Sequence, residues 1–128
     1  MKKHLPIILA GLAFFVPFAI YLITLSPTYI PIDAAEFTLC MKLWGVCHPP
    51  GFPLYTMVGH FFVNFFLVGE TIWRANLFSA IFAALTILTV YLTLVKLGVR
   101  GFFSLLLSLI FAVSYVFWEF SIAADVFS

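Results

Sequence analysis

Charged residues are scarce in this chain: Asp, Glu, Lys and Arg make up 9% of 128 residues, and the formal net charge is +1. Domains that bind nucleic acid normally carry a basic patch, so this balance argues against a nucleic-acid partner. The sequence also has no glycine-rich phosphate loop, no Gly-x-Ser-x-Gly elbow, no His-Glu-x-x-His helix and no internal repeat. The nucleotide, hydrolase and zinc-protease sites that these motifs mark are therefore not predicted, and two cysteines give no metal-site spacing.

Apolar residues, by contrast, make up 65% of the chain, and phenylalanine alone occurs 17 times. A soluble core cannot hide that much apolar surface, so the composition predicts an all-α integral membrane protein that crosses the bilayer several times. The chain stops shortly after a hydrophobic run, at residues 124–128, without a polar tail. We therefore interpret residues 1–128 as the N-terminal part of a larger, truncated transmembrane domain.

Three hydrophobic runs are long enough to cross a bilayer, which takes roughly 20 apolar residues. They cover about residues 5–25, 76–97 and 102–118. No small-residue cleavage site follows the first run, which predicts a permanent anchor in place of a cleaved signal peptide. Pro17 inside this run is a candidate kink.

A fourth run, residues 52–69, is ambiguous, and the distribution of basic residues helps to place it. If the run does not cross, the cytoplasmic side carries Lys2, Lys3, Lys96 and Arg100, and the outer side carries Lys42 and Arg74. If it crosses, each side carries three basic residues, so the first arrangement has the better bias. His60 and Asn64 also interrupt the run. We favour a helix in the outer interface, with crossing as the alternative.

On this topology, residues 27–74 form an outward loop with two interfacial helices joined by a rigid elbow. The first helix begins at Asp33 and Glu36, and Gly45 is its predicted stop. Its apolar stripe comprises Phe37, Cys40, Met41 and Trp44, spaced three or four residues apart. The prolines at positions 49, 50 and 53 then turn the chain toward the second helix.

Cys40 and Cys47 lie seven residues apart, which is about 10 Å along a continuous helix. That separation is too long for a disulfide, so we expect two unpaired thiols. A bridge, which the outward side permits, would require the helix to end near Gly45.

The polar residues of the loop have structural explanations as well as functional ones. The spacing of Asp33 and Glu36 resembles a capping box, which alone would account for both carboxylates. His48 before two prolines is typical of a loop residue, and Arg74 before a span is typical of an interface anchor. However, ionisable groups beside a membrane are costly and often functional, so these positions are also the candidate site.

Four segments, taken in order, resemble a known family. They are Asp33-Ala-Ala-Glu36-Phe37, then residues 43–55 with His48-Pro-Pro-Gly-Phe-Pro-Leu-Tyr, then Arg74-Ala-Asn-Leu-Phe-Ser-Ala, and finally Ala124-Asp125-Val-Phe-Ser. Together they resemble the integral-membrane protein O-mannosyltransferase-like family of GT-C glycosyltransferases. This chain has Asp125 and Phe127 where that family usually has Glu and Tyr.

The resemblance implies a GT-C-like set of N-terminal transmembrane helices and a membrane glycosyltransferase. Such an enzyme would move a mannose-like sugar from a polyprenyl-phosphate donor to a protein or glycan hydroxyl on the non-cytoplasmic side. It would lie in a bacterial or archaeal cell membrane, with the active site outward. A transporter or flippase of a lipid-linked substrate, and a non-catalytic membrane subunit, are the alternatives.

The resemblance also implies roles for five residues. Asp33 is the candidate general base that takes the acceptor proton, with Glu36 as second candidate or as a partner that orients the acceptor. His48 would bind the donor phosphate or the acceptor, Arg74 would pair with phosphate, and Asp125 would be a second-loop carboxylate. No metal ligands are predicted, and a divalent-metal requirement stays open.

Overall fold

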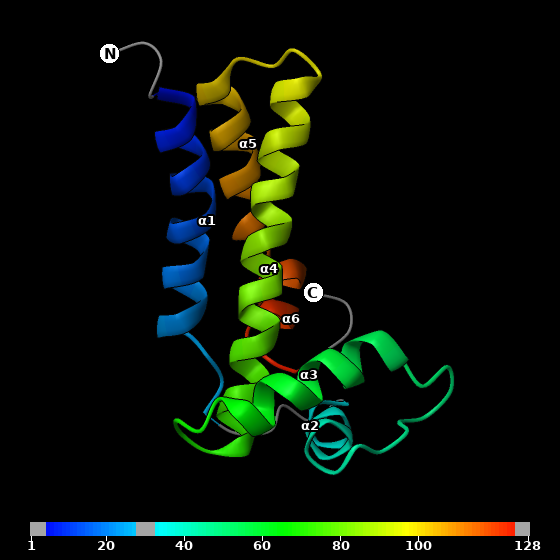
Figure 1. Ribbon diagram of the computed structural model, residues 1–128. Coiled ribbons are helices and arrows are strands. Elements are labelled where there is room, and N and C mark those ends of the chain that lie inside the picture. The colour runs from blue at the N-terminus through cyan, green and yellow to red at the C-terminus, as the bar shows by residue number, and fades with distance from the viewer. Residues whose placement is uncertain (1–4, 28–32, 125–128) are drawn as a thin grey trace.

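The computed structural model describes residues 5–27 and 33–124, and all regular structure in these two ranges is α-helical. The helices are α1 (Leu5–Ile23), α2 (Ala34–Leu43), α3 (Pro53–Phe65), α4 (Thr71–Lys96), α5 (Gly101–Ala112) and α6 (Tyr115–Ser121). In Figure 1, α1, α4 and α5 run side by side as a bundle, and α2 and α3 lie at one end of it. The predicted all-α class is confirmed.

Two helices are long and apolar enough to cross a membrane, namely α1 with 19 residues and α4 with 26. The buried face of α1 comprises Ala13, Pro17 and Tyr21, which recur at every fourth position and so share one side of the helix. The facing surface of α4 is rich in alanine, which allows the helices to approach closely. The Tyr21 hydroxyl donates to the Ala112 carbonyl at 2.8 Å and thereby ties α1 to the end of α5.

The predicted third span, residues 102–118, is not one straight helix. It is divided into α5 and α6, which meet at an angle of 71°. The break falls at Val113 and Ser114, where Ser114 adopts an extended conformation and its hydroxyl donates to the Phe111 carbonyl at 2.8 Å. The run Val113-Ser114-Tyr115-Val116 is made of weak helix formers, which explains the break. If the bent pair crosses as one unit, residues 5–27 and 33–124 contain three candidate spans.

The α3 helix accounts for the ambiguous run 52–69. Its 13 residues extend only about 20 Å, which is shorter than the roughly 30 Å hydrocarbon core. Figure 1 shows α3 lying across the end of α4, next to α2, and not along the bundle. The turn between Lys96 and Arg100 lies at the opposite end. This arrangement agrees with the prediction that α2 and α3 share one side and the basic turn faces the other.

A buried apolar cluster joins the α2–α3 layer to the bundle. Its members are Ala34 and Met41 from α2, Val63 from α3, Ala75 and Phe78 from α4, and Ala124 beyond α6. Because residues from four separate segments meet here, the cluster fixes where α2 begins relative to the membrane-spanning helices.

Candidate functional site

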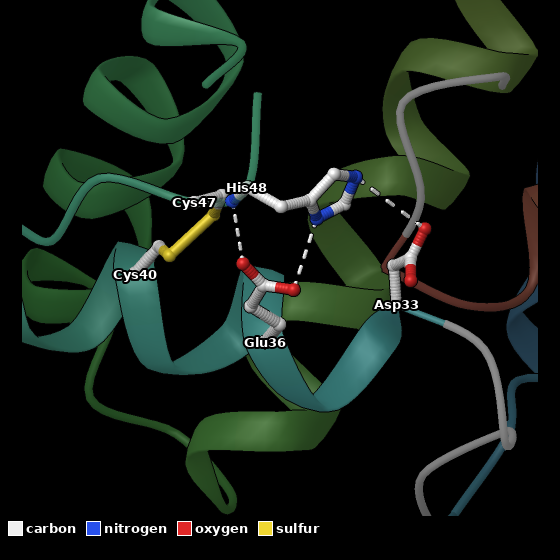
Figure 2. Close-up of polar contacts among 5 residues, drawn as sticks. All are labelled: Asp33, Glu36, Cys40, Cys47 and His48. Atoms are coloured by element: carbon white, nitrogen blue, oxygen red, sulfur yellow. Dashed lines mark hydrogen bonds and ion pairs between the residues drawn. A yellow bond between two sulfur atoms is a disulfide. The ribbon is translucent and has the colours of Figure 1, made fainter. Parts of the chain in front are cut away.

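The carboxylates of Asp33 and Glu36 converge on the imidazole of His48 (Figure 2). Glu36 Oε2 lies 2.9 Å from His48 Nδ1, and Glu36 Oε1 accepts the His48 backbone N–H at 2.6 Å. On the other side of the ring, Asp33 Oδ2 lies 3.9 Å from His48 Nε2. The structure therefore brings together three of the five predicted site residues, and their side chains remain between 41% and 43% exposed.

This geometry excludes the capping-box interpretation of Asp33 and Glu36. Asp33 occupies the N-cap position of α2, but its side chain makes no cap hydrogen bond. The Glu36 carboxylate forms hydrogen bonds with His48, twelve residues further along the chain, and not with the backbone at the start of its own helix. Both carboxylates are therefore turned toward the elbow, where a structural capping role does not account for them.

A disulfide between Cys40 and Cys47 holds the elbow against α2 (Figure 2). The expectation of two unpaired thiols was wrong because the helix ends earlier than Cys47 requires. α2 stops at Leu43, and Trp44, with φ of 57°, reverses the chain in the left-handed conformation. Trp44 thus takes the place predicted for Gly45. The two Cα atoms come within 6.0 Å, a separation that a disulfide can bridge.

The disulfide is one reason why His48 lies over Glu36. Cys40 is one helical turn beyond Glu36, and Cys47 directly precedes His48, so the bond fixes the two partners from both sides. Phe37 is fully buried beneath them and lies 5.8 Å from the imidazole, centroid to centroid. The Pro49–Pro50 peptide bond is cis, and Phe52, with φ of 41°, starts α3.

The hydrogen bonds between Glu36 and His48 shift the pKa of each group. The side-chain hydrogen bond from His48, followed by the backbone one, lowers the pKa of the Glu36 carboxyl. The hydrogen bond to Glu36 raises the pKa of His48 above its usual 6.5, with smaller contributions from the charges of Glu36 and Asp33. Near neutral pH, the pair is therefore biased toward carboxylate and imidazolium.

With His48 protonated, the cluster carries two negative charges and one positive charge. A net negative site repels phosphate, so the geometry favours the acceptor alternative for His48 over the donor-phosphate alternative. The ligand atoms of Asp33, Glu36 and His48 lie within 4.8 Å of one another, which suits a cation once His48 is neutral. In the arrangement described here, His48 is bonded to Glu36 instead.

An apolar groove of about 510 Å³ begins beside this cluster, between α3 and α4. It is lined by Phe52, Pro53, Leu54, Tyr55, Val58, Phe78 and Phe82. Phe52 also contacts the His48 ring, with centroids 6.1 Å apart. The polar cluster and the groove are therefore neighbours at the end of the bundle.

Arg74 is not part of the cluster. It is 8% exposed, and its guanidinium donates to the carbonyls of Val63 and Phe66, at 2.7 and 3.1 Å. It also donates to the Glu70 carbonyl and to the Thr71 hydroxyl. Arg74 lies in α4 because this helix begins at Thr71, five residues before the predicted start. The structure gives Arg74 a structural role at the α3–α4 connection, and phosphate binding stays a prediction.

Asp125 lies outside the described residues, as do Lys2 and Lys3, so their predicted roles are untested. The disulfide was the alternative that the sequence left open, whereas the buried side chain of Asn76 was not predicted. The signal for Asn76 was present, because an amide at the start of an apolar span needs buried hydrogen-bond partners.

Comparisons with known proteins identify the family of the chain. The family model described as "Protein O-mannosyl-transferase TMEM260 N-terminal domain" matches residues 33–128. The mouse protein O-mannosyl-transferase TMEM260 is 31% identical over 110 residues, covering 86% of this chain and 16% of the relative. The tmem260 protein O-mannosyl-transferase of Dictyostelium discoideum is 30% identical over 112 residues, covering 85% and 14%. No solved structure matches the chain.

The chain thus spans only 16% and 14% of the length of these two curated relatives. Both relatives are eukaryotic, so they give no support to the expectation of a bacterial or archaeal membrane. The matched residues begin at Asp33 and include Glu36, the elbow and α4.

Proposed function

This chain belongs to the protein O-mannosyl-transferase TMEM260 N-terminal domain family, and from this membership we propose that it is part of a membrane enzyme that mannosylates protein hydroxyl groups. The observation that carries the proposal is the convergence of Asp33, Glu36 and His48 at the end of a membrane bundle. This cluster lies where a lipid-linked sugar and a protein acceptor would meet.

In the proposed reaction, the acceptor oxygen attacks C1 of the sugar and the bond from C1 to the donor phosphate oxygen breaks. The acceptor proton passes to a carboxylate, and the phosphate leaves with the bonding electron pair. Asp33 is the better base of the two, because its 3.9 Å contact with His48 is longer than a hydrogen bond. Glu36 is engaged twice by His48, which lowers its pKa and weakens it as a base.

We further propose that Glu36 and His48 orient the acceptor. The imidazolium lies between the two carboxylates and can donate to an acceptor hydroxyl that approaches Asp33. The donor is proposed to be a polyprenyl-phosphate mannose on the non-cytoplasmic side. Its phosphate would be bound by cationic groups elsewhere in the full protein, since this cluster is net negative.

The alternatives receive less support. A transporter would need functional polar groups within its spans, but α1 and α5 contain no Asp, Glu, Lys or Arg. The buried serines of α5, Ser104 and Ser108, donate to backbone carbonyls of that helix and of the turn before it. A non-catalytic subunit would need Asp33 and Glu36 only as caps, and neither of them caps α2.

Asp33→Asn in the full-length protein tests the proposal. Asn has nearly the same shape as Asp, and the Asp33 side chain makes no cap hydrogen bond that could be lost, so folding should be retained, but an amide cannot take the acceptor proton. We expect loss of mannose transfer from a polyprenyl-phosphate donor to a Ser/Thr peptide, measured in nanodiscs, with thermal stability close to that of the wild type.

A control separates catalysis from structure, because Asp33→Ala removes both the carboxylate and the polar side chain that contacts His48. If only structure mattered, Asp33→Asn would behave as wild type while Asp33→Ala lost yield. Full transfer by well-folded Asp33→Asn would remove Asp33 as the base.

A further inference from the structure

Asn76 is fully buried in the second turn of α4, where its amide joins two segments that are far apart in sequence. Its Nδ2 donates to the Ser26 carbonyl at 2.9 Å, and its Oδ1 accepts the Ala124 backbone N–H at 2.9 Å. Both ends of the amide are thus occupied by backbone groups of other segments, and neither bond belongs to α4. A residue that served only the helix would need no such partners.

The two segments precede two of the five acidic residues of the chain, Asp33 and Asp125. Ser26 precedes Asp33 along the chain that leaves α1, and Ala124 directly precedes Asp125. The Ser26 backbone N–H also donates to the Ile122 carbonyl at 3.1 Å, so the two segments contact each other beside Asn76. Ala34 and Ala124, the neighbours of Asp33 and Asp125, are members of the same buried cluster.

We propose that Asn76 is a positioning residue for mannose transfer: it sets the start of α2, with Asp33, relative to the segment that follows α6. The expected change in kcat rests on the proposed function, whereas the expected change in the position of α2 does not. Asn76 contacts none of Asp33, Glu36 and His48 in the described contacts, so it acts through the backbone segments that it joins.

Ser79 provides a matched control, because it is also fully buried on α4 and lies only three residues further along. Its hydroxyl shares a 2.7 Å hydrogen bond with the Tyr55 hydroxyl and so ties α3, not the two acidic segments, to α4. Ser79→Ala therefore removes a buried hydrogen bond from the same helix without touching the contacts of Asn76.

The kinetic test uses Asn76→Ala and Ser79→Ala in the full-length protein. A displaced base costs turnover more than binding, so Asn76→Ala should lower kcat by about ten-fold to a hundred-fold. The donor KM should stay within about two-fold, because the donor contacts are unchanged. Ser79→Ala should keep both values near wild type. A rise in donor KM without loss of kcat, or an equal loss of kcat in Ser79→Ala, would overturn the assignment.

A distance measurement tests the inference without substrate. Spin labels at Leu39→Cys on α2 and Val116→Cys on α6, both exposed positions, report the separation of the two segments. We expect a narrow distribution in the wild type and in Ser79→Ala, and a broadened or shifted one in Asn76→Ala. An unchanged distribution in Asn76→Ala overturns the inference. Absence of transfer by the wild type with any mannosyl donor would instead count against the proposed function.

Asn76→Ser serves as a second variant if Asn76→Ala folds poorly. A serine hydroxyl in a helix can bond to the carbonyl four residues earlier, so the new side chain itself is not left unpaired. It is too short to join Ser26 and Ala124. The same changes in kcat and in the distance distribution are expected, and their absence in folded Asn76→Ser also overturns the assignment.

Discussion

At the scale of single residues, the site depends on which partner each ionisable group finds. Glu36 loses freedom as a base because His48 binds both of its oxygens, whereas Asp33 is contacted only at 3.9 Å by that ring. Two carboxylates three residues apart therefore have different surroundings, because His48 forms hydrogen bonds with Glu36 but lies 3.9 Å from Asp33. The difference comes from the chain reversal at Trp44 and the disulfide, which place His48 nearer to Glu36.

The first residue-scale prediction concerns the pH dependence of this pair. The lowered pKa of Glu36 gives a stabilising contribution that is present above its usual 4.5 and is lost as pH falls through the folded value. The raised pKa of His48 also contributes to the stability of the folded protein. This contribution is present below pH 6.5 and is lost as the pH rises through the folded-state pKa of His48. The ion pair is therefore most fully formed between these two folded-state values.

NMR titration of the His48 ring should show a pKa above 6.5 that falls in Glu36→Gln, because the Glu36 carboxylate is the main cause of the shift. Asp33→Asn is the control, and it should lower the pKa of His48 less, since Asp33 is more distant and makes the smallest contribution. A His48 pKa that responds more to Asp33→Asn than to Glu36→Gln would contradict the geometry of the cluster.

The second residue-scale prediction separates the two roles considered for Arg74. Arg74→Lys keeps the charge but loses the planar guanidinium, whose Nη1 donates to the Val63 and Phe66 carbonyls while Nε and Nη2 donate to Glu70 and Thr71. Leaving such buried carbonyls unpaired costs about 1–3 kcal/mol, so thermal unfolding should occur at lower temperature while the donor KM stays unchanged. Lys42→Ala, which removes an exposed lysine of the same layer, should have little effect on stability. A raised donor KM with unchanged stability would restore the phosphate-binding role.

The sequence was enough to select these residues as candidates for the site, but it did not predict which of them contact one another. Asp33, Glu36 and His48 stand out because ionisable groups near a membrane are costly. Their convergence depends on the chain reversal at Trp44, and a tryptophan in the left-handed conformation is not something that local propensity predicts. The motif suggests that Arg74 is a ligand, but the carbonyls that it binds lie at the end of α3 and in the connection to α4, which sequence alone does not place.

At the scale of elements, the elbow and α2 act as one unit because they are covalently closed. Cys40 and Cys47 are 7% and 4% exposed and pack with Phe37, so the disulfide belongs to the core of this layer. The predicted apolar stripe of α2 is confirmed for Phe37, Cys40 and Met41, which are buried, but not for Trp44, which lies beyond the helix and is 51% exposed.

The element-scale prediction is that the disulfide maintains the contact between Glu36 and His48. Cys40→Ser combined with Cys47→Ser should lower the free energy of unfolding by about 2 kcal/mol, at the lower end of the usual range because the closed loop is short. The His48 pKa should also move toward 6.5 as the elbow separates from Glu36. Thermal unfolding and NMR titration measure the two effects.

Reductant provides the control for this prediction. It should reproduce both effects in the wild type and should change nothing in the double-serine variant. Recovery of two alkylated thiols from unreduced, denatured wild-type protein would contradict the disulfide itself.

Helix boundaries show why periodicity predicted some elements better than others. α1 and α4 fall on the predicted apolar runs 5–25 and 76–97 because long apolar runs dominate local preferences, although α4 begins five residues earlier than predicted. The predicted span 102–118 is divided at Val113 and Ser114, where the composition stays apolar but the backbone turns by 71°, and its crossing as one bent span stays a prediction. Hydropathy predicts whether a segment lies in lipid or in water, but it does not predict a bend within the segment. The break between α5 and α6 was therefore visible only in the structure.

At the scale of the whole molecule, the proposed function depends on which side of the membrane the cluster of Asp33, Glu36 and His48 faces. The α2–α3 layer and the turn between Lys96 and Arg100 lie at opposite ends of the bundle (Figure 1). Basic residues favour the cytoplasmic side, which predicts that the turn is inside and the cluster of Asp33, Glu36 and His48 is outside. A donor carried by the outer leaflet could then reach the cluster without crossing the membrane.

Single-cysteine labelling in intact cells tests this orientation. Val68, in the α3–α4 connection, and Leu97, in the α4–α5 turn, are 62% and 75% exposed, so a cysteine at either position should be accessible. The native cysteines are joined to each other and should not react. A membrane-impermeant maleimide added to the non-cytoplasmic side should label Val68→Cys, and it should label Leu97→Cys only after permeabilisation. Labelling of both from one side would show that α4 does not cross, and the reverse pattern would place the site in the cytoplasm, where the proposed outward transfer could not occur.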